Sequence, residues 1–393
     1  MSRATAIVER STGEWSGADS VSRLGTGWEP SVLLLLTVML LAIGIVSVYS
    51  ASAVMAQSQS LPDYWFVTRQ ATGATAGLAI LVGMAYLDYR RLRLFAWPLL
   101  LALIAVLVVM VLPGTQTIAP VTNGARRWFY AGPVGLQPSE LAKLVLLVWT
   151  AALAVKKQDR LPSLSRGLLP FLVVWSIVCA LIFLQPSMSA ALLVGLLSAL
   201  VVFAAGARIG HFLLLGFVVL PVLWAQVDSV AYRMRRIVAF LDPTHDSTGI
   251  SYQITQALTA IGSGGTFGRG FGHGAQKFGY LPEPHNDFLF AMIGEEWGFV
   301  GAVVVIGLFT AFALVGYRIA RHAPDLFGFL LAVGVTNLIA IQAMLHIAVN
   351  LALVPTTGVT LPFMSYGRSS LLVCLAAVGI LINIGRRAGE VAA

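Results

Sequence analysis

The stretch SVLLLLTVMLLAIGIVSVYSAS (31–52) decides the fold, because it is mostly apolar and contains no charged side chain. A helix of about 20 apolar residues spans the roughly 30 Å hydrocarbon core of a bilayer. The whole chain has the same character: 58% of its 393 residues are hydrophobic, 11% are charged and the mean hydropathy is +0.85. Soluble domains carry about 25% charged residues, so a water-soluble enzyme and a disordered chain are both excluded. The sequence predicts an all-α polytopic membrane protein.

Similar apolar runs recur along the chain and predict about ten transmembrane helices. The longest polar stretch, from about 228 to 286, separates the seventh run from the eighth, and we expect it to form a large extracytoplasmic loop. The predicted parts are an N-terminal tail (1–29), a membrane domain (30–385) and a C-terminal tail (386–393). The ten predicted helices are 31–52, 65–87, 94–113, 137–155, 168–185, 189–206, 212–227, 287–316, 326–353 and 368–385.

The distribution of Lys and Arg among the short connections predicts the orientation in the membrane. The short connection 53–64 contains no basic residue, and 114–136 contains only Arg126 and Arg127, whereas the alternate connections are rich in both types. Short cytoplasmic loops carry an excess of Lys and Arg. Both tails are therefore predicted to be cytoplasmic, and the net charge of +8 reflects basic loops rather than a nucleic-acid partner.

The stretch NGARRWFYAGPVGLQPSELAK (123–143) contains the first candidate site residues. Arg126, Arg127 and Trp128 begin a run of two cations and three aromatic residues, which suits an interfacial helix facing anionic head groups or a pyrophosphate. The same composition fits an aromatic belt with basic anchors. Glu140 and Lys143 share a helix face, so they either bind substrate or pair with each other structurally.

The stretch LPEPHNDFLFAMIGEEWGFVG (281–301) contains the strongest candidate for catalysis. Asp287 is expected at the boundary between water and membrane, where partial burial raises a carboxyl pKa and makes a general base. The alternative is a structural role, in which Asn286 or Asp287 caps the following helix. Helical spacing places Glu295 on the same face, so we expect it in the same cavity. His285 is expected to be a hydrogen-bonding neighbour of Asp287 rather than a metal ligand.

Two other polar breaks are predicted on the outer side. Prolines and glycines interrupt VPTTGVTLPFMSYGRSS (354–370), and irregular backbone at membrane depth is tolerated only against protein or a watery cavity. Ser365 lies in this break and is a candidate substrate ligand. The shorter break QPSMS (185–189) is similar, and Arg233 and Arg236 of the long polar stretch add positive charge. These breaks predict one shared, outward-facing site.

Several motifs are absent from the sequence. No Walker A or GxGxxG stretch supports nucleotide use, and no HExxH motif or His/Cys cluster indicates a metal site. The two cysteines, Cys179 and Cys374, both lie in apolar runs, which excludes a disulfide framework. No cofactor is required by the sequence, although a divalent cation stays possible in principle.

The motifs together resemble the SEDS family (shape, elongation, division and sporulation), which includes FtsW and RodA. The resemblance covers nearly all of residues 31–385, and six stretches in the same order make it specific. These stretches are NGARRW (123–128), LQPSELAK (136–143), FLDP (240–243) with YQ (252–253), IGSGG (261–265), GYLPEPHNDFLFAMIGEEWG (279–298) and LVPTTGVTLPFMSYGRSS (353–370).

This resemblance implies a ten-helix peptidoglycan glycosyltransferase that polymerises lipid II into β-1,4 glycan strands at the outer face of the cytoplasmic (inner) membrane. It implies that Asp287 is catalytic and that Arg126, Arg127 and Trp128 form a second functional stretch. The implied substrates are lipid II and undecaprenyl-pyrophosphate-linked glycan. The implied partners are a class B penicillin-binding protein, which is a transpeptidase, and other divisome or elongasome membrane proteins. No nucleic acid is implied.

Some positions depart from the family pattern. Ser187 replaces the acidic residue of QPDxGT, Asn286 replaces a threonine and Arg368 replaces a glycine of SYGGSS. At Thr357 the chain resembles elongation-type members, whereas its QKFGYLPE stretch (276–283) resembles division-type members. We favour a division-type assignment. Two other functions remain open from sequence, namely a lipid II flippase and a non-catalytic scaffold that recruits a transpeptidase.

Overall fold

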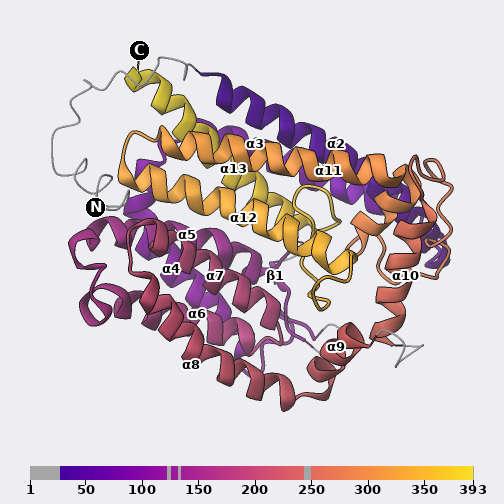
Figure 1. Cartoon of the computed structure of the whole chain (residues 1–393), viewed down its shortest axis with the longest axis horizontal. Coiled ribbons are helices and arrows are strands. Elements are labelled where there is room, and N and C mark those ends of the chain that lie inside the picture. The colour runs from indigo at the N-terminus through magenta and orange to yellow at the C-terminus, as the bar shows by residue number, and fades with distance from the viewer. Residues whose placement is uncertain (1–26, 122–124, 132–133, 243–248, 393) are drawn as a thin grey trace.

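The computed structural model describes residues 27–121, 125–131, 134–242 and 249–392, which form a bundle of long helices (Figure 1). Each of the ten predicted apolar runs contains a helix. Local signals explain several helix ends: Pro138 opens α5, Pro113 follows the end of α4, and the Asp325 carboxylate accepts a hydrogen bond from Gly328 N at the start of α12. The ten helices are α2 (Trp28–Ser58), α3 (Trp65–Tyr86), α4 (Arg90–Val111), α5 (Pro138–Lys156), α6 (Leu169–Phe183), α7 (Met188–Ala204), α8 (Ile209–Asp228), α11 (Leu289–Arg321), α12 (Leu326–Asn350) and α13 (Arg368–Ala392).

Within the described ranges, eight helical segments are long and apolar enough to cross a membrane. The α7 helix is shorter, and α3 is not among the eight. The prediction of an all-α polytopic membrane protein is confirmed. In Figure 1, α2, α3, α11, α12 and α13 form one half of the bundle, and α4 to α8 form the other. The pairing of α3 with α13 is tight because Gly379 allows direct backbone contact with Leu81.

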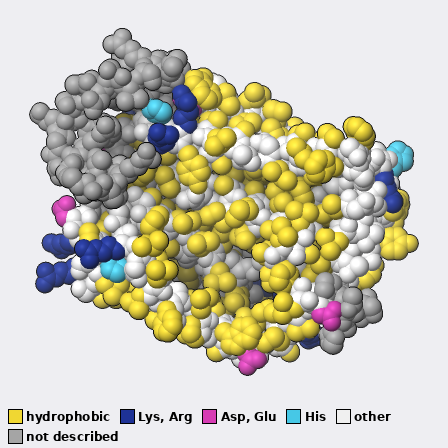
Figure 2. Space-filling model, in the orientation of Figure 1, with side chains coloured by type: hydrophobic (Ala, Val, Ile, Leu, Met, Phe, Trp, Pro, Cys, Tyr) yellow, Lys and Arg dark blue, Asp and Glu magenta, His cyan; other side chains and the backbone are white. Residues whose placement is uncertain are grey.

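The two ends of the bundle differ in charge. The beginning of α2 and the end of α13 lie at one end, far from α9 and α10 (Figure 1). Figure 2 shows a broad belt of hydrophobic side chains across the middle, with most of the visible Lys and Arg gathered at the end where α13 finishes. Two ion pairs join elements there: Arg318 Nε lies 2.9 Å from Glu29 Oε1, and Arg387 Nη1 lies 3.3 Å from Asp88 Oδ2.

The segment between α8 and α11 contains two further helices, α9 (Ala231–Leu241) and α10 (Ile250–Ser263). A glycine-rich loop (264–288) then leads from α10 into α11.

The stretch that includes Arg126 and Trp128 does not form the predicted interfacial helix, so that prediction is wrong. A two-stranded antiparallel hairpin, β1 (Phe129–Ala131) and β2 (Val134–Leu136), lies there instead, with Phe129 paired with Leu136. Aromatic side chains favour strands, which explains the difference.

The α11 helix is kinked at Gly298, which has φ 69° and ψ −162°. A kink releases backbone groups from the helical ladder, and buried groups of this kind need other partners. The glycine-rich loop supplies them. Arg269 N donates to Glu295 O (3.0 Å) and Gly270 N donates to Glu296 O (3.1 Å), while Phe299 N donates to Gly265 O (2.9 Å). The loop is therefore held to α11 by main-chain hydrogen bonds.

We expect Gly298→Ala to destabilise the protein. The backbone conformation at this position is almost exclusive to glycine and costs other residues about 1–3 kcal/mol. A Cβ would also overlap Gly268 N, so the loop would have to move. The matched control is Gly307→Ala, because Gly307 lies in the same helix with open space around it. Thermal unfolding of the purified protein should show a lower melting temperature for Gly298→Ala only. Equal melting temperatures would contradict the described kink.

Candidate active site

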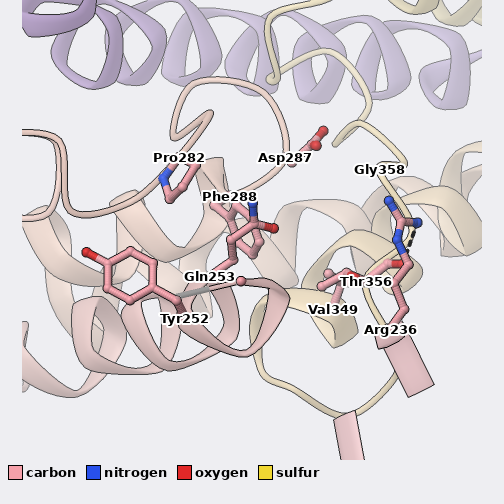
Figure 3. Close-up of a pocket in the computed structure, with 10 residues that line it drawn as sticks. Arg236, Tyr252, Gln253, Pro282, Asp287, Phe288, Val349, Thr356 and Gly358 are labelled. Atoms are coloured by element: carbon pink, nitrogen blue, oxygen red, sulfur yellow. Dashed lines mark hydrogen bonds between the residues drawn. The ribbon is translucent and has the colours of Figure 1, made fainter. Parts of the chain in front are cut away.

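A cavity of about 280 Å³ lies where α9, α10, the glycine-rich loop, α12 and the 354–367 segment meet (Figure 3). Its polar groups come from separate parts of the chain. Arg236 extends from α9 and donates through Nη1 to Thr356 O (3.0 Å), which joins α9 to the 354–367 segment. The lining residues are Arg236, Gly249, Tyr252, Gln253, Pro282, Asp287, Phe288, Val349, Thr356 and Gly358.

Asp287 lies two residues before α11 and lines this cavity (Figure 3). Its main chain is held on both sides, since Asp287 N donates to Glu283 O (3.1 Å) and Asn350 Nδ2 donates to Asp287 O (3.2 Å). The cap of α11 comes from Asn350, whose Oδ1 accepts from Ala291 N (3.0 Å). The alternative role of Asp287 as a helix cap is therefore wrong. Asn350 occupies that position, which leaves the Asp287 carboxylate facing the cavity.

The surroundings of Asp287 raise its pKa to about 6. Burial is the largest cause, because it disfavours the charged carboxylate, and the negative charge of Glu283 acts in the same direction. The positive charges of Arg236 and Arg127 oppose both effects. A carboxylate with a pKa near the working pH suits general base catalysis. The two arginines supply positive charge beside it.

The predicted basic residues lie at different distances from this cavity. Arg236 lines it, and Arg127 is close enough for its charge to act on Asp287. Arg127 also donates through Nη2 to Pro186 O (2.6 Å). The prediction of one shared site is wrong for the 185–189 break, because Gln185 and Pro186 line a second cavity rather than the Asp287 cavity. Arg233 points elsewhere, with its Nη1 donating to Gln226 O (3.0 Å) and its guanidinium 4.5 Å from the Phe183 ring centroid.

Arg126 and Trp128 flank Arg127 in sequence but lie outside the lining of the Asp287 cavity. Arg126 donates through Nη1 to Leu112 O (3.0 Å) and lines a second cavity. Trp128 is half-buried immediately before β1. The side chains of Arg126, Arg127 and Trp128, although consecutive in sequence, therefore lie in three different environments.

His285 and Ser365 support the loop that carries Asp287. His285 is buried with its ring centroid 4.7 Å from that of Phe66 and 5.4 Å from that of Tyr366. The predicted hydrogen bond between His285 and Asp287 is wrong: among the described residues no such bond is formed, because the ring packs between aromatic side chains. Burial lowers the His285 pKa to about 4. Ser365 Oγ donates to Asn286 O (2.8 Å), which fixes the backbone beside Asp287.

Lys143 is buried and Glu140 is partly buried, and neither lines the Asp287 cavity. Lys143 Nζ lies 2.7 Å from Glu140 Oε2 and donates to Gln342 Oε1 (2.8 Å). Gln342 Nε2 in turn donates to Thr360 O (3.0 Å). The structure therefore favours the structural alternative for this pair, which joins α5 to α12 and supports the segment that lines the cavity.

The prediction that Glu295 shares a cavity with Asp287 is wrong. Asp287 precedes the helix, so helical spacing from it does not apply. Glu295 is fully buried and accepts hydrogen bonds from Ala275 N (2.8 Å) and Gln276 N (3.2 Å) of the glycine-rich loop. Arg269 Nη1 lies 3.7 Å from its carboxylate. Glu295 holds the loop rather than lining the Asp287 cavity.

Several residues that line or support the site were not among the predicted ones. Gln342, His346 and Asn350 recur every fourth residue along the otherwise apolar α12, and all three are buried. Polar side chains within a membrane helix are costly and usually functional, so this spacing was an available signal. Tyr252 and Gln253 of α10 line the cavity, and the only sequence signal for them was the YQ stretch of the family resemblance.

No cluster of three or more His, Cys, Asp or Glu side chains suited to a metal ion occurs in the part of the chain that the structure describes.

Comparisons with known proteins agree over most of the chain. A family model for FtsW, RodA and SpoVE, described as "Cell cycle protein", matches residues 31–390. The protein named "Probable peptidoglycan glycosyltransferase FtsW" from Trichlorobacter lovleyi is 45% identical over 353 residues, which are 90% of this chain and 92% of that protein. Stage V sporulation protein E of Bacillus subtilis is 40% identical over 355 residues, which are 90% of this chain and 96% of that protein.

Solved structures give the same result. A chain from the structure described as "Structural coordination of polymerization and crosslinking by a peptidoglycan synthase complex" has a TM-score of 0.74 and 31% identity, with 92% of this chain and 98% of that chain covered. The rod shape determining protein RodA of Thermus thermophilus has a TM-score of 0.65 and 30% identity, with 93% and 98% covered.

Proposed function

We propose that this chain, which belongs to the FtsW, RodA and SpoVE family of cell cycle proteins, is a peptidoglycan glycosyltransferase and polymerises lipid II. The observation that carries the proposal is the cavity at Asp287, where a carboxylate with a raised pKa lies within the influence of two arginines. A base beside fixed positive charge is the equipment that glycosyl transfer from a pyrophosphate requires.

The site is proposed to face the outside of the cytoplasmic membrane, with both termini in the cytoplasm. The concentration of Lys and Arg at the end of the bundle where α13 finishes supports this orientation (Figure 2). The Asp287 cavity lies toward the opposite end, beside α9 and α10 (Figure 1). Lipid II would reach it from the outer leaflet while its chain stays in the bilayer.

In the proposed reaction, Asp287 accepts the proton of the 4-hydroxyl group of one lipid-linked disaccharide. The hydroxyl oxygen attacks the anomeric carbon at the reducing end of a second lipid-linked glycan and forms the β-1,4 bond. The bond between that carbon and the pyrophosphate oxygen breaks, and undecaprenyl pyrophosphate leaves with the electron pair. Arg127 and Arg236 stabilise the negative charge that develops on the leaving group.

A class B penicillin-binding protein is the proposed partner, and the match to a chain of a peptidoglycan synthase complex supports this class of partner. A division-type role is proposed over an elongation-type role. The 45% identity to the FtsW relative, compared with 30% to RodA, supports this preference.

Polymerisation of lipid II by the purified protein in liposomes, with and without a cognate transpeptidase, tests the proposed function. We expect glycan strands from the wild type, at least when the partner is present. No strands under either condition, combined with transbilayer movement of labelled lipid II, would instead support the flippase.

The rate of polymerisation should rise with pH through about 6, because Asp287 accepts a proton only when it is deprotonated. Glu283→Gln removes a like charge, which lowers the Asp287 pKa and moves the rising limb to lower pH. Initial rates measured on both sides of pH 6 for the two proteins check both points. A limb that stays at the same pH in Glu283→Gln would contradict the electrostatic account.

A further inference from the structure

A second cavity, of about 350 Å³, lies at the ends of α4 and α6. Its lining is mostly apolar and includes Met110, Val111, Val121 and Leu184. Val121 and Leu184 are 57% and 61% exposed, so the mouth of the cavity opens onto the apolar outer surface of the bundle. An occupant with a hydrocarbon chain would therefore enter directly from the bilayer.

The polar groups of this cavity favour an anion. Arg126 is the charged side chain among the described lining residues, and the buried Gln185 also lines the cavity. Arg126 holds its guanidinium at the cavity by donating through Nη1 to Leu112 O (3.0 Å). A guanidinium has five N–H donors, so others remain for a phosphate oxygen. A cation in the lining of a mostly apolar cavity complements an anionic lipid phosphate.

The second cavity is adjacent to the Asp287 site through the arginine pair. Pro186 lines the second cavity, and its carbonyl oxygen accepts a hydrogen bond from Arg127 Nη2 (2.6 Å). Arg127 in turn acts electrostatically on Asp287. The chain thus places Arg126 toward one cavity and Arg127 between the two. A pyrophosphate that spans both arginines would have its lipid chain in the second cavity and its sugar carbon toward Asp287.

We propose that the Arg126 cavity binds the polyprenyl pyrophosphate of the glycosyl donor, and that the Asp287 cavity receives the acceptor sugar. This inference rests on the proposed function, in which two lipid-linked glycans are bound at the same time. The two cavities, which Arg127 connects, provide one place for each of them. Holding the donor and the acceptor in fixed orientations lowers the entropic barrier to their reaction.

Direct binding of undecaprenyl pyrophosphate to the full-length protein in nanodiscs tests this assignment without turnover. We expect Arg126→Gln to weaken binding at least tenfold and Arg126→Lys to retain part of it. Val121→Trp should weaken binding similarly, because it fills the mouth from an exposed position without changing the arginine. The matched control is Arg69→Gln, which removes an exposed cation stacked on Trp65 away from both cavities. That variant should bind like the wild type, and melting temperatures of all variants should confirm folding.

Competition experiments distinguish undecaprenyl pyrophosphate from other anions that could occupy the Arg126 cavity. Inorganic pyrophosphate and phosphatidylglycerol should compete only weakly, since the first lacks the chain and the second lacks the pyrophosphate. Unchanged binding in both Arg126→Gln and Val121→Trp, or equal competition by phosphatidylglycerol, would overturn the assignment. Strand formation by the wild type alongside those results would leave the proposed function intact. Conversely, normal binding that depends on Arg126 in a protein that makes no strands would overturn the function and keep the site.

Discussion

Asp287→Ala should reduce lipid II polymerisation by about 10²- to 10⁴-fold, which is the usual contribution of a general base. The carboxylate faces the cavity and takes no part in capping α11, because Asn350 performs that role. Its removal should therefore leave the fold unchanged. Rates of strand formation in liposomes, measured with the transpeptidase partner, give the comparison.

Asp63→Asn is the matched control for Asp287→Ala. Asp63 lies in the connection between α2 and α3, so its substitution removes an acidic charge outside the proposed site. We expect wild-type rates from Asp63→Asn and equal melting temperatures for all three proteins. A well-folded Asp287→Ala protein that polymerises at the wild-type rate would show that another group accepts the proton.

Lys277→Met should destabilise the protein by about 3–5 kcal/mol, the usual result of removing one partner from a buried ion pair. Lys277 Nζ lies 3.0 Å from Glu296 Oε1 and donates to Ser50 Oγ (3.1 Å) and Gly272 O (2.7 Å). The Lys277 and Glu296 side chains are 6% and 4% exposed. The substitution leaves Glu296 as a buried carboxylate whose remaining side-chain donor, among the described residues, is the Ser50 hydroxyl group.

The double variant Lys277→Met with Glu296→Gln separates this charge effect from loss of packing. It removes both charges, so most of the lost stability should return. Lys156→Met, at an exposed position at the end of α5, should change the free energy of unfolding by no more than about 0.5 kcal/mol. Thermal unfolding measures all three variants. If the double variant is as unstable as Lys277→Met alone, the buried charge is not the cause.

The helices were predictable from sequence because each long apolar run, such as 31–52, satisfies the length requirement of a bilayer without reference to the rest of the chain. The kink at Gly298 was not predictable in this way. The run 287–316 is predominantly apolar and predicts one helix, whereas the kink is stabilised by hydrogen bonds to residues 265–270, which are distant in sequence. Pairings of that kind depend on tertiary structure.

The candidate site was likewise predictable from sequence only in part. Local sequence indicates Asp287, because a carboxylate preceded by two prolines stands before an apolar run. It does not indicate which groups surround that carboxylate. Helical spacing misplaced Glu295, since the helix begins only at Leu289, and the partner of Glu296 is Lys277 from a loop. Buried polar side chains find their partners through packing, which local periodicity does not encode.

Release of undecaprenyl pyrophosphate from lipid II by Asp287→Asn, beside the wild type in liposomes with the transpeptidase partner, tests the assignment of Asp287 most directly. The amide has nearly the shape of the carboxylate but does not accept the proton. We predict release from the wild type and a rate at least about 10²-fold lower from a folded Asp287→Asn protein. Equal rates of release from the two proteins would contradict the assignment of Asp287 as the base.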